Sequence, residues 1–331
     1  MSGYWIDVVL ALATMLILAR GLRQVPTYND GRRELRGISI WAVGGGLAIW
    51  FAVQIALGLV LGFALAMTMG DRMLTTDPSQ LLQEQLNEVI IVGQVIGLLA
   101  VLVATNIGQR AFRRQSALDL GLRPYHGWLL DVIFGLVLGF IGFFLLFLVG
   151  SVTGQVEVVS HNDVGPVLFQ GLFTSLAVFI TVALGEELLI RGYVLQNLEL
   201  GWGTVGAAVA SSFLWGFLHF SNPGATLAAV VNIAAAGLVY AYAYLITRSL
   251  WLPIALHLSW NFSQGSLFGF TVSGLATPGI MRLELIGPES VTGGAFGPEA
   301  GLIIIPVLVL QIIALRWWLN VRPALGISCS E

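Results

Sequence analysis

Lysine is absent from this chain of 331 residues, in which all fifteen residues of the lysine and arginine group are arginine. Without lysine, the chain has no serine/lysine dyad, no lysine Schiff base and no phosphate-binding P-loop. Cysteine is nearly absent as well, because Cys329 stands alone, and this excludes an intramolecular disulfide. Mechanisms that depend on lysine and folds held by disulfides are therefore excluded.

Charge is scarce throughout the chain. Charged residues make up 10% of it and hydrophobic residues 57%, with a mean hydropathy of +0.87. This balance is far from that of a soluble domain and indicates a polytopic membrane protein. The net charge of -3 gives no indication of a nucleic-acid partner. We expect one all-α membrane domain over residues 1–331, a polytopic bundle of about eight or nine transmembrane helices.

Long apolar runs mark the expected spans. They cover residues 4–19, 38–69, 87–107, 128–150, 166–199, 204–220, 225–247, 250–270 and 301–319. The run 4–19 is short and contains Asp7, so a crossing, an interfacial helix and a re-entrant segment all stay open for it. The longest polar interruption, residues 271–300, is rich in glycine and proline, and we expect an ordered outer loop with a structural role.

Arginine placement predicts an orientation, because cytoplasmic loops accumulate positive charge. With the N-terminus outside, thirteen of the fifteen arginines fall on the inner side, and only Arg72 and Arg282 fall outside. If residues 4–19 do not cross, the N-terminus moves inside. The rest of the chain keeps its orientation in either case.

Three charged side chains interrupt the apolar run Ala183–Arg191. Ionised groups at membrane depth cost several kcal/mol unless they are paired or neutralised, so their presence together indicates a function. In a helix, Glu187 and Arg191 lie four residues apart on one face, in the favourable order for an ion pair. Glu186 points about 100° away from that face. It has no partner nearby in the sequence and is the candidate functional carboxylate.

Two histidines and an asparagine also lie within apolar runs. His257 and Asn261 share a helix face, and so do Trp215 and His219. A single intramembrane histidine is more often an interhelical hydrogen-bonding residue than a catalytic one. At about 1.5 Å of rise per residue, however, the candidate glutamate, both histidines and the asparagine reach overlapping depths in the inner half of the bilayer. We therefore expect them to share one site.

The residue types restrict the chemistry of that site. No His-Glu-x-x-His run is present and the histidine spacing is not a standard zinc signature, so a metal is not indicated. Ser273 lies in the expected outer loop without a nearby histidine, which disfavours a serine/histidine protease. A desolvated glutamate is suited to take a proton from water, with histidine and asparagine as donors to an oxyanion.

The three motifs, in this order, resemble those of the CPBP (Abi) family of intramembrane proteases, which includes the type II CAAX prenyl endopeptidases. Glu-Glu-Leu-Leu-Ile-Arg at 186–191 is similar to the family motif Glu-Glu-x-x-x-Arg. Trp-Gly-Phe-Leu-His at 215–219 is similar to Phe-x-x-x-His, with tryptophan where phenylalanine is usual. His-Leu-Ser-Trp-Asn at 257–261 is similar to His-x-x-x-Asn. The resemblance covers the core from residue 165 to residue 310, and residues 293–301 look like bacterial members.

This resemblance implies an intramembrane endopeptidase. We expect no cofactor, although a metal stays open. Glu186 would be the general base that activates water, and His219 would assist it. His257 and Asn261 would hold the developing oxyanion. The implied substrate is a membrane-associated protein or peptide, including C-terminal and lipidated ones, and the implied location is a bacterial inner membrane with the pocket in its cytoplasmic half.

Three further residues would support the site, and other functions stay open. Glu187 and Arg191 would brace their helix, and Trp215 would keep an aromatic ring beside the motif histidine. A metal-dependent peptidase using the same glutamate and histidines is the alternative within enzymes. A non-catalytic membrane scaffold or immunity protein would retain the fold, and a transporter would use the polar cluster as a relay.

Overall fold

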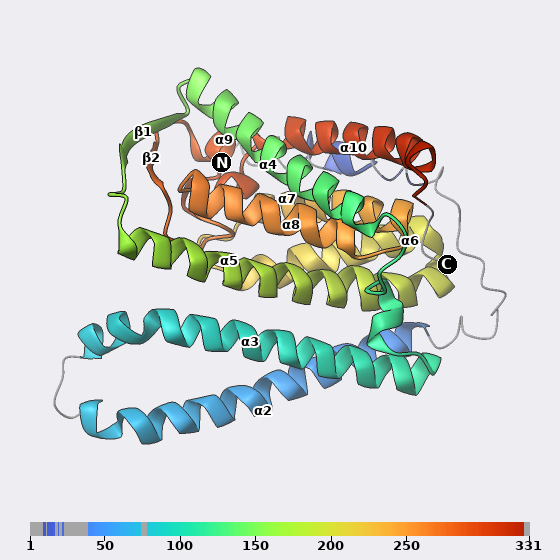
Figure 1. The fold of residues 1–331 in the computed structure, drawn as a ribbon, viewed down its shortest axis with the longest axis horizontal. Coiled ribbons are helices and arrows are strands. Elements are labelled where there is room, and N and C mark those ends of the chain that lie inside the picture. Colours follow the sequence, from blue (N-terminus) through green and yellow to red (C-terminus); the bar gives the residue numbers. More distant parts are fainter. Residues whose placement is uncertain are drawn as a thin grey trace.

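The computed structural model describes residues 9–10, 12–16, 19, 22, 39–73 and 78–327. Within them the chain is a helix bundle with one two-stranded sheet, which confirms the all-α polytopic fold (Figure 1). The long helices are α2 Ser39–Met73, α3 Pro78–Arg113, α4 Trp128–Val152, α5 Pro166–Glu187, α6 Gln196–Leu218, α7 Leu227–Thr247, α8 Trp251–Phe262 and α10 Ile304–Val321. Shorter elements are the strands β1 Val156–His161 and β2 Met281–Leu285, the helix α9 Glu289–Thr292, the 3-10 turn η7 Pro298–Ala300, and the π-helices η3 Leu188–Leu195 and η5 Ser263–Leu267.

Six helical segments among the described residues are long and apolar enough to cross a membrane. One of them, Pro166–Ser221, contains 56 residues. At about 1.5 Å per residue it exceeds twice the thickness of a hydrocarbon core, so it is long enough for two crossings. It turns at Gly203, where φ is 69°, between the expected runs 166–199 and 204–220. Half of the expected run 4–19 lies outside the described residues.

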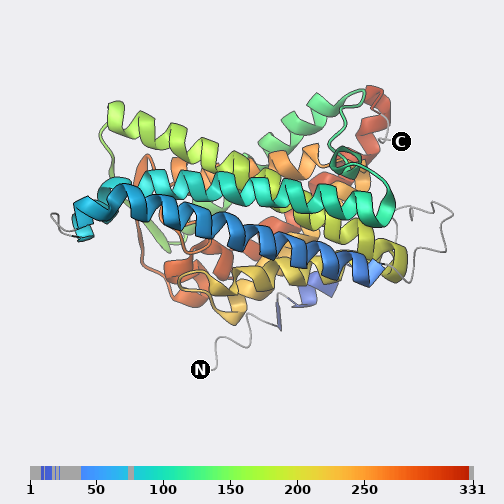
Figure 2. The same ribbon diagram turned by 90° about the horizontal axis from the view of Figure 1, so that it is seen from below.

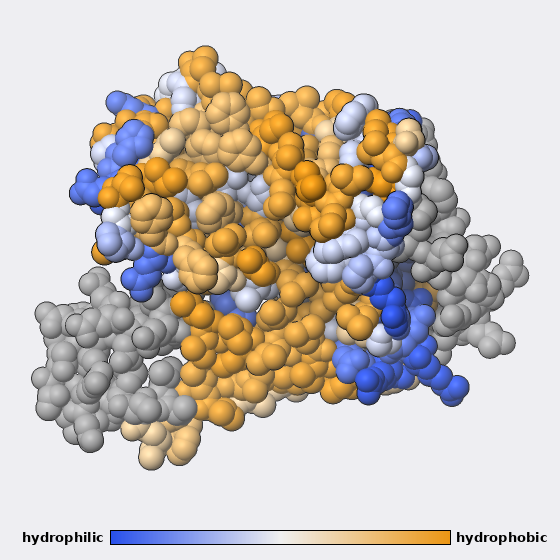
Figure 3. Space-filling model, viewed as in Figure 1, coloured by the Kyte–Doolittle hydropathy of each residue, from blue (hydrophilic) through white to orange (hydrophobic). Residues whose placement is uncertain are grey.

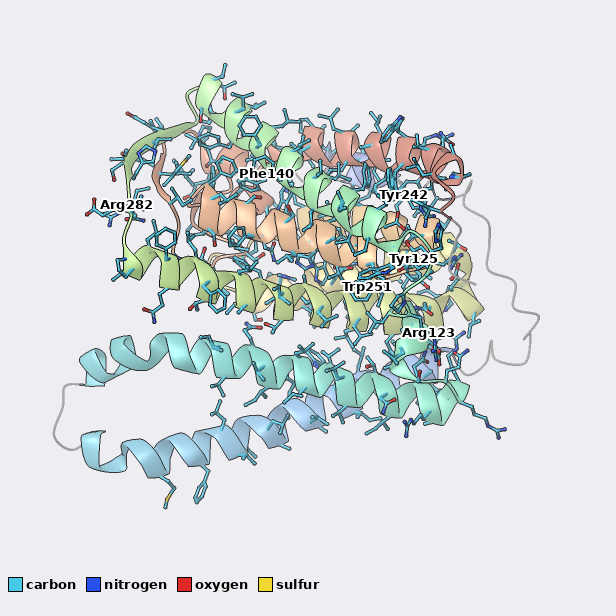
Figure 4. The ribbon with its side chains drawn as sticks, in the orientation of Figure 1. Arg123, Tyr125, Phe140, Tyr242, Trp251 and Arg282 are labelled. Atoms are coloured by element: carbon cyan, nitrogen blue, oxygen red, sulfur yellow. The ribbon has the colours of Figure 1, made fainter. Side chains whose placement is uncertain are left out.

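The helices run along one common direction. α2 and α3 form an antiparallel pair that lies beside α5, as Figures 1 and 2 show from two sides. An apolar band covers the middle of the molecule, with hydrophilic side chains gathered at the two ends (Figure 3). Arg123, predicted to be inside, and Arg282, predicted to be outside, lie at opposite ends of the bundle (Figure 4). The end of the bundle that carries Arg282 is the predicted outer end.

Glycines bring α8 close to α4. A Cβ atom added at Gly135 would lie 2.7 Å from the carbonyl oxygen of Leu252, and one added at Gly139 would lie 2.6 Å from that of Leu256. Only glycine allows two helix backbones to approach this closely, as in the small-residue interfaces of membrane helices. The contact fixes the height and rotation of α8, which carries His257 and Asn261.

A buried ion pair ties α4 to the end of α10. Arg322 Nη2 lies 2.9 Å from Asp131 Oδ2, and Trp318 Nε1–H donates to Asp131 Oδ1 at 2.6 Å. Arg322 also donates to the carbonyl oxygen of Ile246 at the end of α7. Because both charges are buried and fully hydrogen-bonded, this cluster joins three helices at the end opposite Arg282.

The outer segment, residues 271–300, is more than a loop. Its strand β2 pairs antiparallel with β1, which lies between α4 and α5. Gly274, with φ of 85°, packs its backbone directly against the carbonyl oxygen of Pro223. Asn222 Nδ2–H donates to the carbonyl oxygen of Ser273 at 3.0 Å. The segment is therefore fixed to the turn between α6 and α7, next to His219.

Candidate active site

One cavity in the bundle gathers the predicted site residues. It has a volume of about 890 Å³. The four residues predicted to be catalytic all line it: Glu186, His219, His257 and Asn261. Trp215 lines it as well, whereas Glu187 and Arg191 lie behind its wall and are fully buried. The structure thus brings together, from α5, the end of α6 and α8, the side chains that overlapping depths predicted to meet.

Glu186 is held at the cavity by an indole. Trp215 Nε1–H donates a hydrogen bond of 2.6 Å to Glu186 Oε2. The Glu186 side chain is 34% exposed, so its carboxylate is accessible from the cavity. The sequence interpretation gave Trp215 only the task of an aromatic neighbour. The structure adds a hydrogen bond that a phenylalanine at this position cannot make.

His219 approaches the same carboxylate oxygen. Its Nε2 atom lies 4.0 Å from Glu186 Oε2, and its Nδ1 atom lies 2.8 Å from the backbone carbonyl oxygen of Trp215. A carbonyl oxygen only accepts, so Nδ1 carries the proton of the neutral ring and Nε2 is an acceptor. The 4.0 Å separation is too long for a direct hydrogen bond and short enough for one water molecule to bridge.

Glu187 contacts both Arg191 and His257 through one carboxylate oxygen. Its Oε1 atom lies 2.9 Å from Arg191 Nη1, which confirms the ion pair predicted from their spacing. The same oxygen lies 3.0 Å from His257 Nδ1. A carboxylate accepts, so Nδ1 donates and the ring turns Nε2 away from Glu187. Glu187 therefore orients His257 as well as bracing its own helix, a task that local spacing could not reveal.

Aromatic rings enclose Arg191. Its guanidinium carbon lies 4.4 Å from the centre of the Trp215 ring and 5.2 Å from that of Tyr240. Tyr240 in turn stacks on His257, with ring centres 5.1 Å apart and planes 16° from parallel. These contacts link both histidine motifs to the glutamate motif through one packed cluster. Tyr240 also lines the cavity, and nothing in the sequence singled it out.

The backbone departs from α-helical geometry at two places beside the site. α5 continues into the π-helix η3, which carries Arg191, and η5 begins directly after the helix that carries Asn261. π-helical turns are rare and frequently lie at functional sites. They change the rotation of the residues that follow, and Glu187 and Arg191 still form their ion pair across the start of η3.

Asn261 is placed to meet a substrate. It is buried, lines the cavity, and lies one helical turn beyond His257. Among the described residues, none forms a hydrogen bond with its side-chain amide. A buried amide that faces a cavity without a protein partner is available to a ligand.

A second carboxylate, which the sequence interpretation missed, lines the same cavity. Glu299 Oε2 accepts hydrogen bonds from the Ser273 backbone N–H at 2.6 Å and from the Ser273 hydroxyl at 2.9 Å. Burial raises the pKa of Glu299, and the bonds from Ser273 oppose the shift in part. The signal in the sequence was a glutamate directly before the apolar run 301–319, inside a segment expected to be structural only.

A metal site does not emerge from the geometry of the described part of the chain. Within it, no group of three or more histidine, cysteine, aspartate or glutamate side chains is arranged to hold a metal ion.

One of the comparisons with known proteins gives a match. A family model described as type II CAAX prenyl endopeptidase Rce1-like matches residues 167–263. The matched stretch is less than a third of the chain and contains all three motifs, from Glu186 to Asn261. No curated protein and no solved structure gave a match.

Proposed function

We propose that this chain, of which residues 167–263 match the Rce1-like CAAX endopeptidase model, is a glutamate-dependent intramembrane endopeptidase. Its substrate is a membrane-associated protein or peptide, which enters the cavity with the scissile bond beside Glu186. The observation that carries this proposal is the pairing of a cavity-exposed carboxylate with His219 Nε2 at 4.0 Å. That arrangement suits a water molecule held between two proton acceptors.

In the proposed reaction, the bridging water attacks the carbonyl carbon of the scissile bond. Its proton passes to Glu186, and a bond forms between the water oxygen and the carbonyl carbon. His219 holds the water through Nε2 while its Nδ1–H stays bonded to the backbone of Trp215. When the tetrahedral intermediate collapses, the carbon–nitrogen bond breaks and the leaving amine takes the proton back from Glu186.

The developing oxyanion would face α8. The free amide of Asn261 supplies one N–H donor, and His257 supplies a second from Nε2 when its ring is doubly protonated. Glu187 then balances the charge of that ring through the 3.0 Å contact at Nδ1. In comparable enzymes, removing one such preorganised donor destabilises the intermediate by about 3 kcal/mol.

One observation supports the alternative of a metal-dependent peptidase. Both His219 and His257 line the cavity and use Nδ1 for a protein hydrogen bond, which leaves Nε2 available to a ligand. Metal-binding histidines commonly have this arrangement, with the second nitrogen held by a carbonyl or carboxylate. Metal analysis of purified protein, together with cleavage assays after chelation, distinguishes the two mechanisms.

The proposed function is tested by replacing Glu186. Glu186→Gln keeps the size of the side chain and its acceptor for Trp215, and it removes the base. Membrane peptides from cells with wild-type protein and with the variant are compared by mass spectrometry, and purified protein is assayed on the peptides that differ. Loss of cleavage by a folded variant is expected. Substantial cleavage by Glu186→Gln refutes the mechanism, and an unchanged cellular phenotype favours a scaffold.

We also propose that the protein lies in a bacterial inner membrane with the arginine-rich end inward. The apolar band between two hydrophilic ends supports insertion along the bundle axis (Figure 3). The opposite positions of Arg123 and Arg282 agree with the predicted sidedness (Figure 4). A cysteine accessibility assay, with labels introduced at each of these two positions, tests the orientation.

A further inference from the structure

Glu299 is a buried charge in the cavity that the proposed reaction does not use. Its side chain belongs to η7, and the residue is 8% exposed. Only two carboxylates line the described cavity, Glu186 and Glu299, and no arginine lines it. A carboxylate with such burial is costly unless a cation or several hydrogen bonds compensate it.

The hydrogen-bond partners of Glu299 are uncharged. Both hydrogen bonds from Ser273 reach Oε2, and the neutral amide of Gln264 lies near the carboxyl group. Among the described residues, no arginine forms an ion pair with it. The carboxylate is therefore solvated by neutral donors on one side, and its other side borders the cavity.

Several contacts fix this carboxylate in place. Asn222 binds the carbonyl oxygen of Ser273 at 3.0 Å, and Asn232 Nδ2–H donates to the carbonyl oxygen of Gly301 at 3.1 Å. The two segments that carry Ser273 and Glu299 are thus tied to α7 and to the turn before it. A group held in this way needs little reorganisation to bind a ligand.

Glu299 also lies near the catalytic groups. His219 is the basic group that acts on it electrostatically, and the turn beyond His219 carries Asn222, which binds the Ser273 segment. A ligand group beside Glu299 would therefore lie close to the bond that Glu186 attacks.

We propose that Glu299 forms a subsite that binds a guanidinium or ammonium group of the substrate, next to the scissile bond. This proposal rests on the proposed endopeptidase function, and it adds the chemical class of residue that the enzyme selects. An arginine or lysine side chain, or a free amino terminus, supplies the cation and the N–H donors that Glu299 lacks. A neutral residue of the same shape leaves the carboxylate uncompensated.

The subsite should therefore discriminate between a charged side chain and its neutral analogue. A site built to pair with a charged group rejects the neutral analogue, because binding the analogue leaves the buried charge desolvated and unpaired. We expect arginine to be preferred over its neutral isostere citrulline by about 10- to 100-fold in affinity.

Binding and cleavage are measured separately to test the subsite. The probes are fluorescent octapeptides of apolar sequence in which arginine is scanned along the chain, each with a citrulline twin. Binding in detergent micelles is measured on Glu186→Gln, which removes the base, and on Glu186→Gln combined with Glu299→Gln. The control is Glu186→Gln combined with Glu284→Gln, since Glu284 is an exposed carboxylate on β2 at the same end.

The arginine peptide should bind about 10- to 100-fold more tightly than its twin to Glu186→Gln and to the Glu284 control. The ratio should fall to near one when Glu299 is replaced. A ratio near one on Glu186→Gln, or one that survives the loss of Glu299, overturns the subsite. Should Glu299→Gln not fold, Glu299→Asp, which keeps the charge, is expected to retain a preference for arginine and overturns the proposal if it binds both twins equally.

Cleavage of the same peptides by the wild-type protein tests the underlying function. Cleavage without any preference for arginine refutes the subsite and leaves the endopeptidase. Binding with a preference for arginine but without cleavage refutes the endopeptidase and retains Glu299 as a cation site. Absence of binding by every peptide overturns the subsite.

Discussion

The hydrogen bond between Trp215 and Glu186 can be tested directly, because Trp215→Phe removes the donor and keeps an aromatic ring at the position. Trp215→Phe deletes the indole N–H that donates to Glu186 Oε2 at 2.6 Å. The ring should still pack against His219, 5.2 Å away, and cover the Arg191 guanidinium. The substitution therefore tests the hydrogen bond more than the packing.

The expected loss of activity follows from the negative charge of the hydrogen-bond acceptor, Glu186. A hydrogen bond to a charged group contributes about 1.5–3 kcal/mol, which corresponds to roughly 10- to 150-fold in rate if it is lost in the transition state. Without the indole, the carboxylate of Glu186 is free to rotate away from the bridging water. We expect kcat/KM to fall by about 10- to 100-fold, chiefly through kcat, with little change in the melting temperature.

A matched control separates this effect from the loss of indole volume. Trp260 also lines the cavity, from α8, and packs edge-on against Phe143 rather than bonding to Glu186. Trp260→Phe makes the same chemical change in the same cavity. If both variants lose activity equally, or if Trp215→Phe retains the kcat of the wild type, the assignment of Trp215 as the residue that positions Glu186 is wrong.

Three further predictions follow from the contacts of the site. Glu187→Gln and Arg191→Ala should each reduce folded yield, because breaking a buried pair costs about 3–5 kcal/mol, and retained melting temperatures in detergent would contradict this. Asn261→Ala should lower kcat by about 10²–10³, and Asn261→Asp should be worse; higher activity of the aspartate variant, sensitive to chelator, would instead indicate metal ligation. Because the raised pKa of Glu299 lets the folded state keep a proton that the unfolded chain loses above its ordinary pKa of 4.5, stability should fall as pH rises through that window. Glu299→Gln should therefore melt above the wild type at pH 7 and not at pH 4, and equal melting curves would contradict the buried charge.

The charged motif could be predicted because local spacing determines it. The ion pair between Glu187 and Arg191 follows from four residues of separation on one helix face, and the structure contains it. The hydrogen bond from His257 Nδ1–H to Glu187 Oε1 spans 70 positions in the sequence. It depends on how closely α8 approaches its neighbours, which Gly135 and Gly139 on α4 allow. Packing of this kind leaves no periodic signal near either partner.

The fold of the outer segment, residues 271–300, could not be predicted from the sequence. Glycines, prolines and polar residues between two apolar runs predict a loop, and they do not show where the loop folds back. Ser273 and Glu299 meet because Gly274 packs against Pro223 and the Gly301 carbonyl is bound by Asn232. The contact of Gly274 with Pro223 and that of Asn232 with Gly301 each join residues more than 40 positions apart, so neither composition nor spacing could place Glu299 in the cavity.

The cavity wall is formed partly by the stretch that matches the family model and partly by segments outside it. The groups assigned to bond cleavage all lie within residues 167–263, the stretch that matches the family. Much of the remaining wall comes from elsewhere: Trp50 and Gln54 on α2, Gln94 on α3, and Glu299 on the outer segment. A shared catalytic stretch therefore supports a shared reaction, whereas the side chains that meet the rest of a substrate belong to parts of the chain outside the match. The selectivity of this protein should accordingly change with substitutions on α2, α3 and the outer segment while the chemistry at Glu186 is retained.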